Sequence, residues 1–175
     1  MRIPGLAGGH IGELVAELAP LVAGSLVREL LPLPPRDLLL VLAPPAGAAG
    51  EKVRRLRLSA GPLAARLHLQ IGRVRRHTGP VDPFFARAAE CLVGARIAAL
   101  LQVEGDRVVR LEVAGPAGPR ALVIELLGRH GNLVLLDGSL RVLDLLVPPR
   151  GAAAAAPRLA AGAPYALPPG REGGT

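Results

Sequence analysis

The sequence predicts an α+β fold in which about seven or eight antiparallel strands pack with two flanking helices. Residues 121–147 form three short apolar runs separated by the polar turns GRHGN and DGS, which is the pattern of an antiparallel meander. Residues 53–58 and 65–71 alternate between apolar and polar side chains, as half-buried strands do. Residues 11–18 and the stretch after Asp82-Pro83 instead repeat apolar residues at helical spacing.

A helix and a hairpin are expected first. Ile11, Leu14 and Leu18 share one helical face, and Pro20 is expected to end or kink this helix. Two apolar runs, 25–31 and 37–42, flank the proline-rich link LPLPP and predict a β-hairpin with its prolines at the edge.

The next two strands are predicted to carry one apolar face and one basic face. The apolar side chains are those of Leu56, Leu58, Leu67, Leu69 and Ile71. The candidate phosphate-binding residues lie on the other face and in the loop that follows: Arg55, Arg57, Arg66, His68, Arg73, Arg75 and Arg76. So many cations with so few acids favour a phosphate-binding strip, and the alternative is a solvated sheet face beside an arginine-rich loop.

The second helix has a clear expected start and stop. Asp82 is a good N-cap, proline suits the first helical position after it, and Gly94 is a plausible C-terminal stop. Residues 96–104 and 108–114 are predicted strands around the turn EGDR. Beyond Val147 the composition shifts to Pro, Ala and Gly, so residues 1–147 are expected to form one domain and 148–175 a C-terminal strap or linker.

The charge balance favours an anionic partner. The net charge of +7 and the pI near 11.3 favour an anionic partner, and nucleic acid is the most frequent one. Trp is absent, and Phe84, Phe85 and Tyr165 are the only aromatic residues, so base stacking is disfavoured. Nucleic-acid contacts are therefore expected to involve phosphates, sugars and shape.

Several other classes are disfavoured. Cys91 is the only cysteine, and the four histidines show no metal-ligand spacing, so we expect neither a disulfide framework nor a metal or other cofactor. No Ser-His-acid pattern or other catalytic set emerges. No secretory signal or uncharged apolar stretch of membrane length is present, so a cytoplasmic protein without a membrane partner is expected.

The string IELLGRHGNLVLLDG resembles the signature of the NFACT-N domain, also called the fibronectin-binding protein A N-terminal domain. That signature reads Glu, two hydrophobic residues, Gly-Arg-His-Ser-Asn, four hydrophobic residues and Asp; here it occupies residues 125–137, with Gly131 in place of the Ser. Four further strings follow the family order: Leu56-Leu58-Ser59 before a proline turn, DPF at 82–84, GDR at 105–107 and PYALPP at 164–169. The resemblance spans nearly the whole chain.

The resemblance implies a module of a ribosome-associated quality-control factor. Such proteins bind the obstructed large ribosomal subunit with its rRNA and tRNA, and support C-terminal tailing of nascent chains during rescue of stalled ribosomes. It assigns tRNA binding to Asp106 and Arg107, because the family's Asp-Arg pair engages tRNA near the anticodon; the alternative for this pair is a polar β-turn. Arginine offers a planar donor fork that a nearby carboxylate can orient. Arg129 and His130 are expected to have a structural or general RNA-facing role, and no enzymatic activity is expected.

The sequence also departs from the family pattern. The Asp usual ahead of the first helix is missing at Pro4-Gly5-Leu6, and the basic pair usual on the second helix falls on Ala89-Glu90. The helix-hairpin-helix, coiled-coil and NFACT-R regions of the family are absent from these 175 residues. We therefore expect either an excised or truncated domain, for which a separate chain carrying those regions is one candidate partner, or a degenerate stand-alone domain. In both cases we expect incomplete tailing activity.

NFACT-N is also similar to the N-terminal domain of formamidopyrimidine-type DNA glycosylases, which implies a sandwich-like arrangement of the sheets. Those enzymes use an N-terminal proline amine as nucleophile; here Arg2 follows Met1, and Pro4 lies too far in. The second hypothesis is accordingly a glycosylase-like DNA-binding protein without the catalytic proline. The third is a fibronectin-binding surface adhesin, and the missing export signal counts against it.

Overall fold

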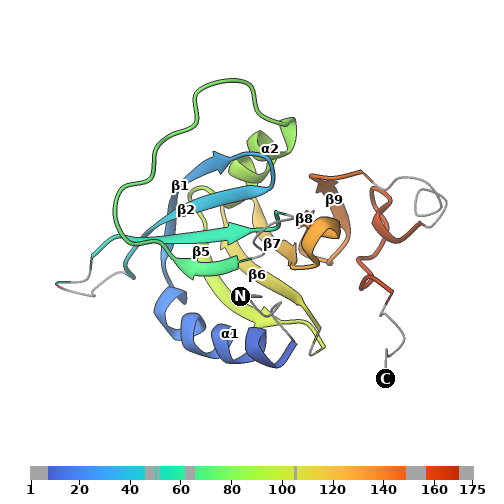
Figure 1. The fold of residues 1–175 in the computed structure, drawn as a ribbon, viewed down its shortest axis with the longest axis horizontal. Helices are drawn as coiled ribbons and strands as arrows, with labels where there is room; N and C mark the ends of the chain where they lie inside the picture. Colours follow the sequence, from blue (N-terminus) through green and yellow to red (C-terminus); the bar gives the residue numbers. More distant parts are fainter. Residues whose placement is uncertain are drawn as a thin grey trace, which may run out of the picture.

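A computed structural model describes residues 8–45, 50, 52–61, 66–104, 106–148 and 157–169, and among them nine strands form one antiparallel sheet. The strand order is β4-β3-β2-β1-β5-β6-β7-β8-β9. The bounds are β1 (Leu26–Leu33), β2 (Asp37–Ala43), β3 (Arg54–Ser59), β4 (Arg66–Leu69), β5 (Arg96–Gln102), β6 (Val108–Gly115), β7 (Gly118–Glu125), β8 (Asn132–Leu136) and β9 (Val142–Leu145). Two α-helices, α1 (Gly8–Val22) and α2 (Pro83–Leu92), lie on opposite sides of the view in Figure 1. The predicted α+β class is confirmed, with nine strands rather than seven or eight.

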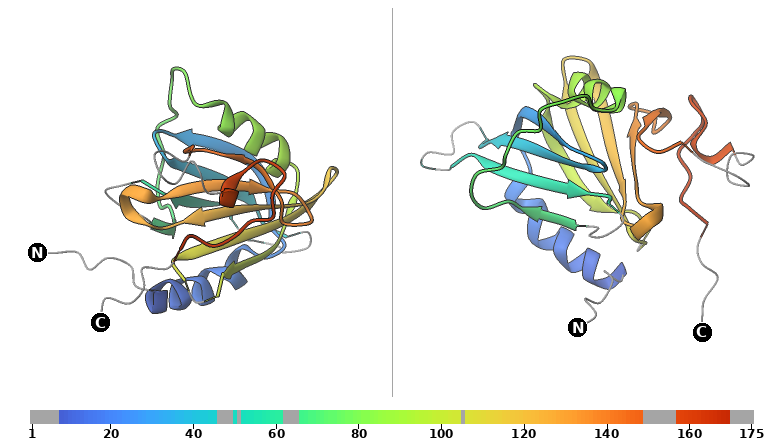
Figure 2. Two further views of the ribbon diagram at one scale, coloured as in Figure 1. Left: turned by 90° about the vertical axis from the view of Figure 1, so that its right-hand side faces the viewer. Right: turned by 45° about the horizontal axis from the view of Figure 1, so that its top comes forward.

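Strands β1 and β5 have the fewest paired residues of any two neighbouring strands in the sheet. Leu26 and Arg96 are the single registered pair there, and a 2.8 Å hydrogen bond from the amide of Val27 to the carbonyl of Ala95 supports it. Strands β4–β1 and strands β5–β9 run in different directions on either side of this junction (Figure 2). Their inner faces share one hydrophobic core with α1 and α2. One bent sheet thus produces the sandwich-like arrangement.

The second helix begins where expected, whereas α1 extends beyond the predicted stretch at both ends. The carboxylate of Asp82 accepts a 2.9 Å hydrogen bond from the amide of Phe84, and Pro83 occupies the first turn of α2. In α1, by contrast, the helix continues through Pro20 to Val22, so Pro20 does not end it, and the kink expected as the alternative stays a prediction. Val22 is fully buried in the shared core, and this packing offsets the cost of an internal proline.

The meander predicted for residues 121–147 is built from β7, β8 and β9. In β7, Leu122 and Ile124 face the shared core, whereas Ala121 and Val123 belong to a second hydrophobic cluster on the other face. A strand buried on both faces needs a continuous apolar run, which accounts for the sequence ALVI. The described part of the C-terminal strap, residues 157–169, covers this second cluster and inserts Leu159 into it.

The prediction is wrong for one apolar side chain of the basic hairpin. Leu56, Leu58, Leu67 and Leu69 face the shared core as expected. Ile71 does not, because β4 ends at Leu69 and the side chain of Ile71 is 92% exposed. The chain leaves the sheet at this point and runs as an irregular link to α2.

Candidate nucleic-acid interface

The turns that follow β5 and β7 lie side by side at one end of the sheet. The amide of Leu126 donates to the carbonyl of Arg107 over 2.9 Å, so the β5–β6 turn adjoins the short 3-10 helix η1 (Gly128–His130). This contact brings Asp106 and Arg107 near Arg129 and His130, and we call these four residues the turn surface. Gly105, which precedes the pair in the family string, lies outside the described residues.

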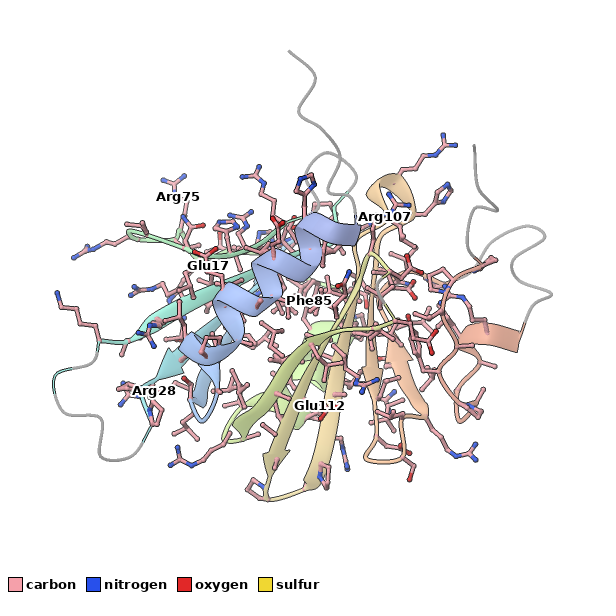
Figure 3. The ribbon with its side chains drawn as sticks, turned by 90° about the horizontal axis from the view of Figure 1, so that it is seen from below. Glu17, Arg28, Arg75, Phe85, Arg107 and Glu112 are labelled. Carbon is pink, nitrogen blue, oxygen red and sulfur yellow. The ribbon has the colours of Figure 1, made fainter. Side chains whose placement is uncertain are left out.

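The side chain of Arg107 is left available by its neighbours. Asp106 directs its carboxylate to the backbone amide of Arg107 (2.7 Å), while the side-chain amide of Gln102 donates to the Asp106 carbonyl (2.7 Å). Within the described part of the chain, no hydrogen bond or ion pair holds the guanidinium of Arg107. Figure 3 shows this side chain at the same margin of the molecule as Arg75. The carboxylate therefore shapes the turn and does not pair with the arginine head group.

The hairpin turn between β1 and β2 supports η1 from the side. Arg36, which sequence reasoning did not single out, donates to the carbonyls of Arg129 (2.8 Å) and Gly131 (3.3 Å). These bonds leave the exposed side chains of Arg129 and His130 facing outward, 3.3 Å apart between Nε and Nε2. No sequence pattern around Arg36 predicts this contact, because its partners lie more than 90 residues away.

Gly131 lies too close to β3 for any side chain. A Cβ atom built there would lie 2.2 Å from the carbonyl oxygen of Ala60 and 3.0 Å from its carbonyl carbon. Both atoms are backbone and cannot rotate away. The replacement of the family's Ser by Gly at this position therefore matches the local packing of this chain.

Strands β3 and β4 carry their predicted basic side chains on the outer face of the sheet, at its β4 edge. Cross-strand pairing sets Arg57 opposite His68, and Val41 lies between Glu29 and Arg55 in one row, so these side chains share a face. The residues predicted to bind phosphate on this side are now called the arginine face: Arg55, Arg57, Arg66, His68, Arg73, Arg75 and Arg76. Arg55, Arg57, Arg66 and His68 share this face of β3 and β4, whereas Arg73, Arg75 and Arg76 lie on the link that follows β4.

Two members of the arginine face are held by carboxylates. Arg57 pairs with Asp37 (2.8 Å), which also accepts the hydroxyl of Ser59 (2.6 Å). Arg76 pairs with Glu29 of β1, so the irregular link after β4 is fastened over this face of the sheet. The hydrogen bond from Arg76 lowers the pKa of Glu29.

The family signature at residues 125–137 contributes to a buried hydrogen-bond cluster that has a structural role. Glu125, which is 1% exposed, accepts both terminal nitrogens of Arg158 (2.6 and 3.2 Å) and the hydroxyl of Tyr165 (2.6 Å). Asn132 opposite it holds both backbone groups of Val147 at 2.9 Å. Two strings that identify the family, IELLGRHGN and PYALPP, therefore meet through Glu125 and Tyr165.

Burial dominates the electrostatics of this cluster. It raises the pKa of the Tyr165 hydroxyl, and the negative charge of Glu125 adds to the shift. Burial opposes the charge of Arg158, but the hydrogen bond and the charge of Glu125 outweigh it, so the pKa of Arg158 is also raised. The carboxylate, the guanidinium and the neutral phenol form one satisfied network that fastens the strap to the sheet.

The described residues offer no metal centre: no group of three or more His, Cys, Asp or Glu side chains is placed to hold an ion. An open hollow of about 310 Å³ lies between α1 and β4, lined by Leu14, Arg66, Leu67 and His68. None of the helices in the described ranges has the length and apolar character to cross a membrane.

Comparison with known proteins places this geometry in a family. The profile of the family described as NFACT N-terminal and middle domains matches residues 10–174. Two strains of Streptococcus pneumoniae, serotype 2 D39 and ATCC BAA-255/R6, have an Rqc2 homolog, RqcH, that is 31% identical over 104 residues. The match covers 56% of this chain and 19% of each relative, so it spans about a fifth of their length.

Solved structures share the fold. The N-terminal domain of the fibronectin-binding protein PavA from Streptococcus pneumoniae superposes with a TM-score of 0.78 at 25% identity, covering 93% of this chain and 62% of that one. The N-terminal part of the fibronectin/fibrinogen-binding protein from Streptococcus suis gives 0.79 at 20%, covering 93% and 61%. The fibrinogen-binding protein from Staphylococcus aureus gives 0.72 at 22%, covering 94% and 57%. With a profile match over nearly its whole length and this shared fold, the chain belongs to the NFACT family.

Proposed function

We propose that this chain is a non-enzymatic RNA-binding module of a ribosome-associated quality-control factor, and that it contacts tRNA through the turn surface. One observation carries the proposal: Asp106 and Arg107, the family's Asp-Arg pair, lie beside Arg129 and His130, and the guanidinium of Arg107 is open. Membership of the family and the resemblance to RqcH support a role at the ribosome.

The two members of the pair have different roles. The planar fork of Arg107 suits a phosphate or a guanine edge, for which lysine would be a poor substitute. Asp106 holds the turn through its bond to the Arg107 amide and presents the rest of its carboxylate to a base amino group. The arginine face supplies less specific attraction to rRNA of the large subunit.

Co-sedimentation with large subunits that carry tRNA, over a salt series, tests the proposal. The variant Asp106→Ala/Arg107→Ala is expected to bind at least about tenfold more weakly, because one good bidentate contact contributes about 1–3 kcal/mol. The matched control is Arg110→Ala/Glu112→Ala, an acid–base pair on β6 (2.9 Å); Figure 3 shows Glu112 over the strands in the lower half of the view, away from Arg107. Equal loss in both variants, or wild-type binding no better than that of an unrelated basic domain, contradicts the proposal.

A second candidate function is binding to a host matrix protein. The structural relatives named above as fibronectin- or fibrinogen-binding proteins favour it. Saturable binding to immobilised fibronectin that is insensitive to Asp106→Ala/Arg107→Ala, without binding to large subunits, would support this function over the first.

A further inference from the structure

The positive charge of the chain is concentrated in one segment. Residues 52–81 contain eight of the 21 Lys and Arg residues and none of the 14 Asp and Glu residues. The other 13 basic residues and 14 acidic residues almost cancel, so this segment accounts for the net charge of +7. It comprises β3, β4 and the link to α2, which together carry the arginine face.

Internal ion pairs divide the six arginines of the arginine face into two groups. Arg57 and Arg76 are neutralised by Asp37 and Glu29, and they fix the shape of the surface and the path of the link. For Arg55, Arg66, Arg73 and Arg75, the described ranges supply no hydrogen bond or ion pair to the guanidinium groups. We call these four the open arginines. Three are exposed and Arg55 is half-buried.

The open arginines sit where a polyanion can reach them without displacing the fold. Arg55 and Arg66 project from neighbouring strands, and the Arg76–Glu29 pair holds the intervening link against the same face. Figure 3 shows Arg75 extending from this link away from the ribbon. A row of fixed cations with no carboxylate to satisfy them attracts phosphates and releases their counterions.

The aromatic residues show which nucleic-acid structure fits. Phe84 and Phe85 are 1% and 2% exposed and stack edge-on within the core. Tyr165 packs against the second cluster and donates its hydroxyl to Glu125. The two phenylalanine rings are thus inaccessible to bases, and the half-buried Tyr165 is held against the strap cluster, away from the arginine face. A surface that binds phosphates without stacking bases favours a double helix over an unpaired strand.

The arginine face is continuous with the turn surface. Arg66 pairs with Ser59 at the end of β3, and the next residue, Ala60, packs its carbonyl against Gly131. Arg36 links the same corner to η1. Figure 3 shows Arg75 and Arg107 on one margin of the molecule. An RNA bound at the turn surface can therefore extend along the open arginines.

We propose that the open arginines bind the phosphate backbone of an RNA helix, as a contact separate from the turn surface. This inference rests on the proposed function, because it assumes that the anionic partner is RNA. The turn surface discriminates its target by base and phosphate contacts, and the open arginines hold an adjoining helical segment regardless of its sequence.

Fluorescence anisotropy of the full chain with a labelled RNA hairpin, over a salt series, tests the proposal. The slope of log K against log salt is expected to fall by about 3–4 in Arg55→Gln/Arg66→Gln/Arg73→Gln/Arg75→Gln, since each lost phosphate contact removes about 0.9. The control replaces four arginines outside the segment, Arg87, Arg96, Arg120 and Arg141, by Gln, and its slope is expected to stay close to wild type. An unpaired oligonucleotide of the same length should bind more weakly than the hairpin.

The outcomes of these measurements distinguish failure of this inference from failure of the proposed function. An unchanged slope in the quadruple variant, or an equal fall in the control, overturns the inference; so does equal binding of hairpin and unpaired strand. If Asp106→Ala/Arg107→Ala still loses binding to large subunits carrying tRNA, the proposed function survives that result. If neither variant changes anything, both fail. Should the quadruple variant fold poorly, Arg73→Gln/Arg75→Gln in the irregular link is expected to lower the slope by about half as much.

Discussion

Replacing Arg158 by Met should destabilise the protein far more than its position in a C-terminal segment implies. The substitution leaves the carboxylate of Glu125, which is 1% exposed, without its guanidinium partner, while the Met fills a similar volume. Breaking a buried ion pair by removing one member costs about 3–5 kcal/mol. The hydroxyl of Tyr165 still donates to Glu125, which keeps part of the network.

The strap limits how large this cost can become. If residues 157–169 detach, Glu125 regains water, and the loss is then the docking free energy of the strap. Leu159, 6% exposed, contributes about 1.5–3 kcal/mol of this. The bond from Tyr165 to a charged acceptor contributes about as much again. We therefore expect the free energy of unfolding to fall by about 3 kcal/mol in Arg158→Met.

Urea denaturation and amide hydrogen exchange measure the two parts of this effect. The reporters of strap docking are the amide of Val142, bonded to the Ala163 carbonyl (2.9 Å), and that of Gly162, bonded to the Val142 carbonyl (2.8 Å). Both should exchange faster in the variant. Arg141→Met is the matched control, because Arg141 bonds only an exposed carbonyl of the same strap and should cost less than about 1 kcal/mol. A loss below about 1 kcal/mol in Arg158→Met would refute the reasoning.

Three further predictions concern stability. Gly131→Ser should lower the free energy of unfolding by at least about 1–3 kcal/mol, because its Cβ would overlap the backbone of Ala60. Gly138→Ser should cost less, because a Cβ atom built at that position has its nearest neighbours at 3.3 Å. Thermal unfolding compares the two variants, and equal losses would count against the packing argument. The folded-state pKa of Tyr165 is raised, so the stabilisation from its neutral hydroxyl is fully present below about pH 10 and is lost as pH rises beyond that. Above this pH the free energy of unfolding should fall by up to about 1.4 kcal/mol per pH unit. Tyr165→Phe should remove this dependence. Tyrosinate absorbance follows the ionisation directly, because the chain has one tyrosine, and ionisation at its ordinary pKa in the folded protein would contradict the burial. Asp82→Ala should cost about 1 kcal/mol by loss of the α2 cap, and an unchanged denaturation midpoint would argue against that cap.

Local patterns were sufficient for most of the elements. The alternation in VRRLRL and ARLHLQI predicts which side of β3 and β4 is basic, and the pair Asp82-Pro83 predicts the start of α2. These features depend on neighbours in the chain. Pro20 was expected to end α1 because the cost of a proline inside a helix is local and visible in the sequence. The burial of Val22 that offsets this cost comes from the assembled core, which the sequence does not show.

The site was predictable only in part, for the same physical reason. The basic residues on β3 and β4 follow from strand periodicity. The contact between the β5–β6 turn and η1 does not, nor does the clamp that Arg36 places on η1 across 93 residues. The division of the arginine face into paired and open members depends on Asp37 and Glu29, which precede their arginine partners by 20 and 47 residues.

The Glu125 cluster also sets an order of events during synthesis. Arg158 and Tyr165 follow Glu125 by 33 and 40 residues, so the strand carrying the carboxylate is synthesised before either partner. Until they are added, the outer face of β7 and β8 lacks its cover, and Glu125 lacks its partners Arg158 and Tyr165. The described strap thus completes the second hydrophobic cluster, because that face of the sheet is covered only when residues 157–169 fold back onto it. A nascent chain arrested before that point would display an apolar face and an unpaired acid, which are the marks of an unfinished protein.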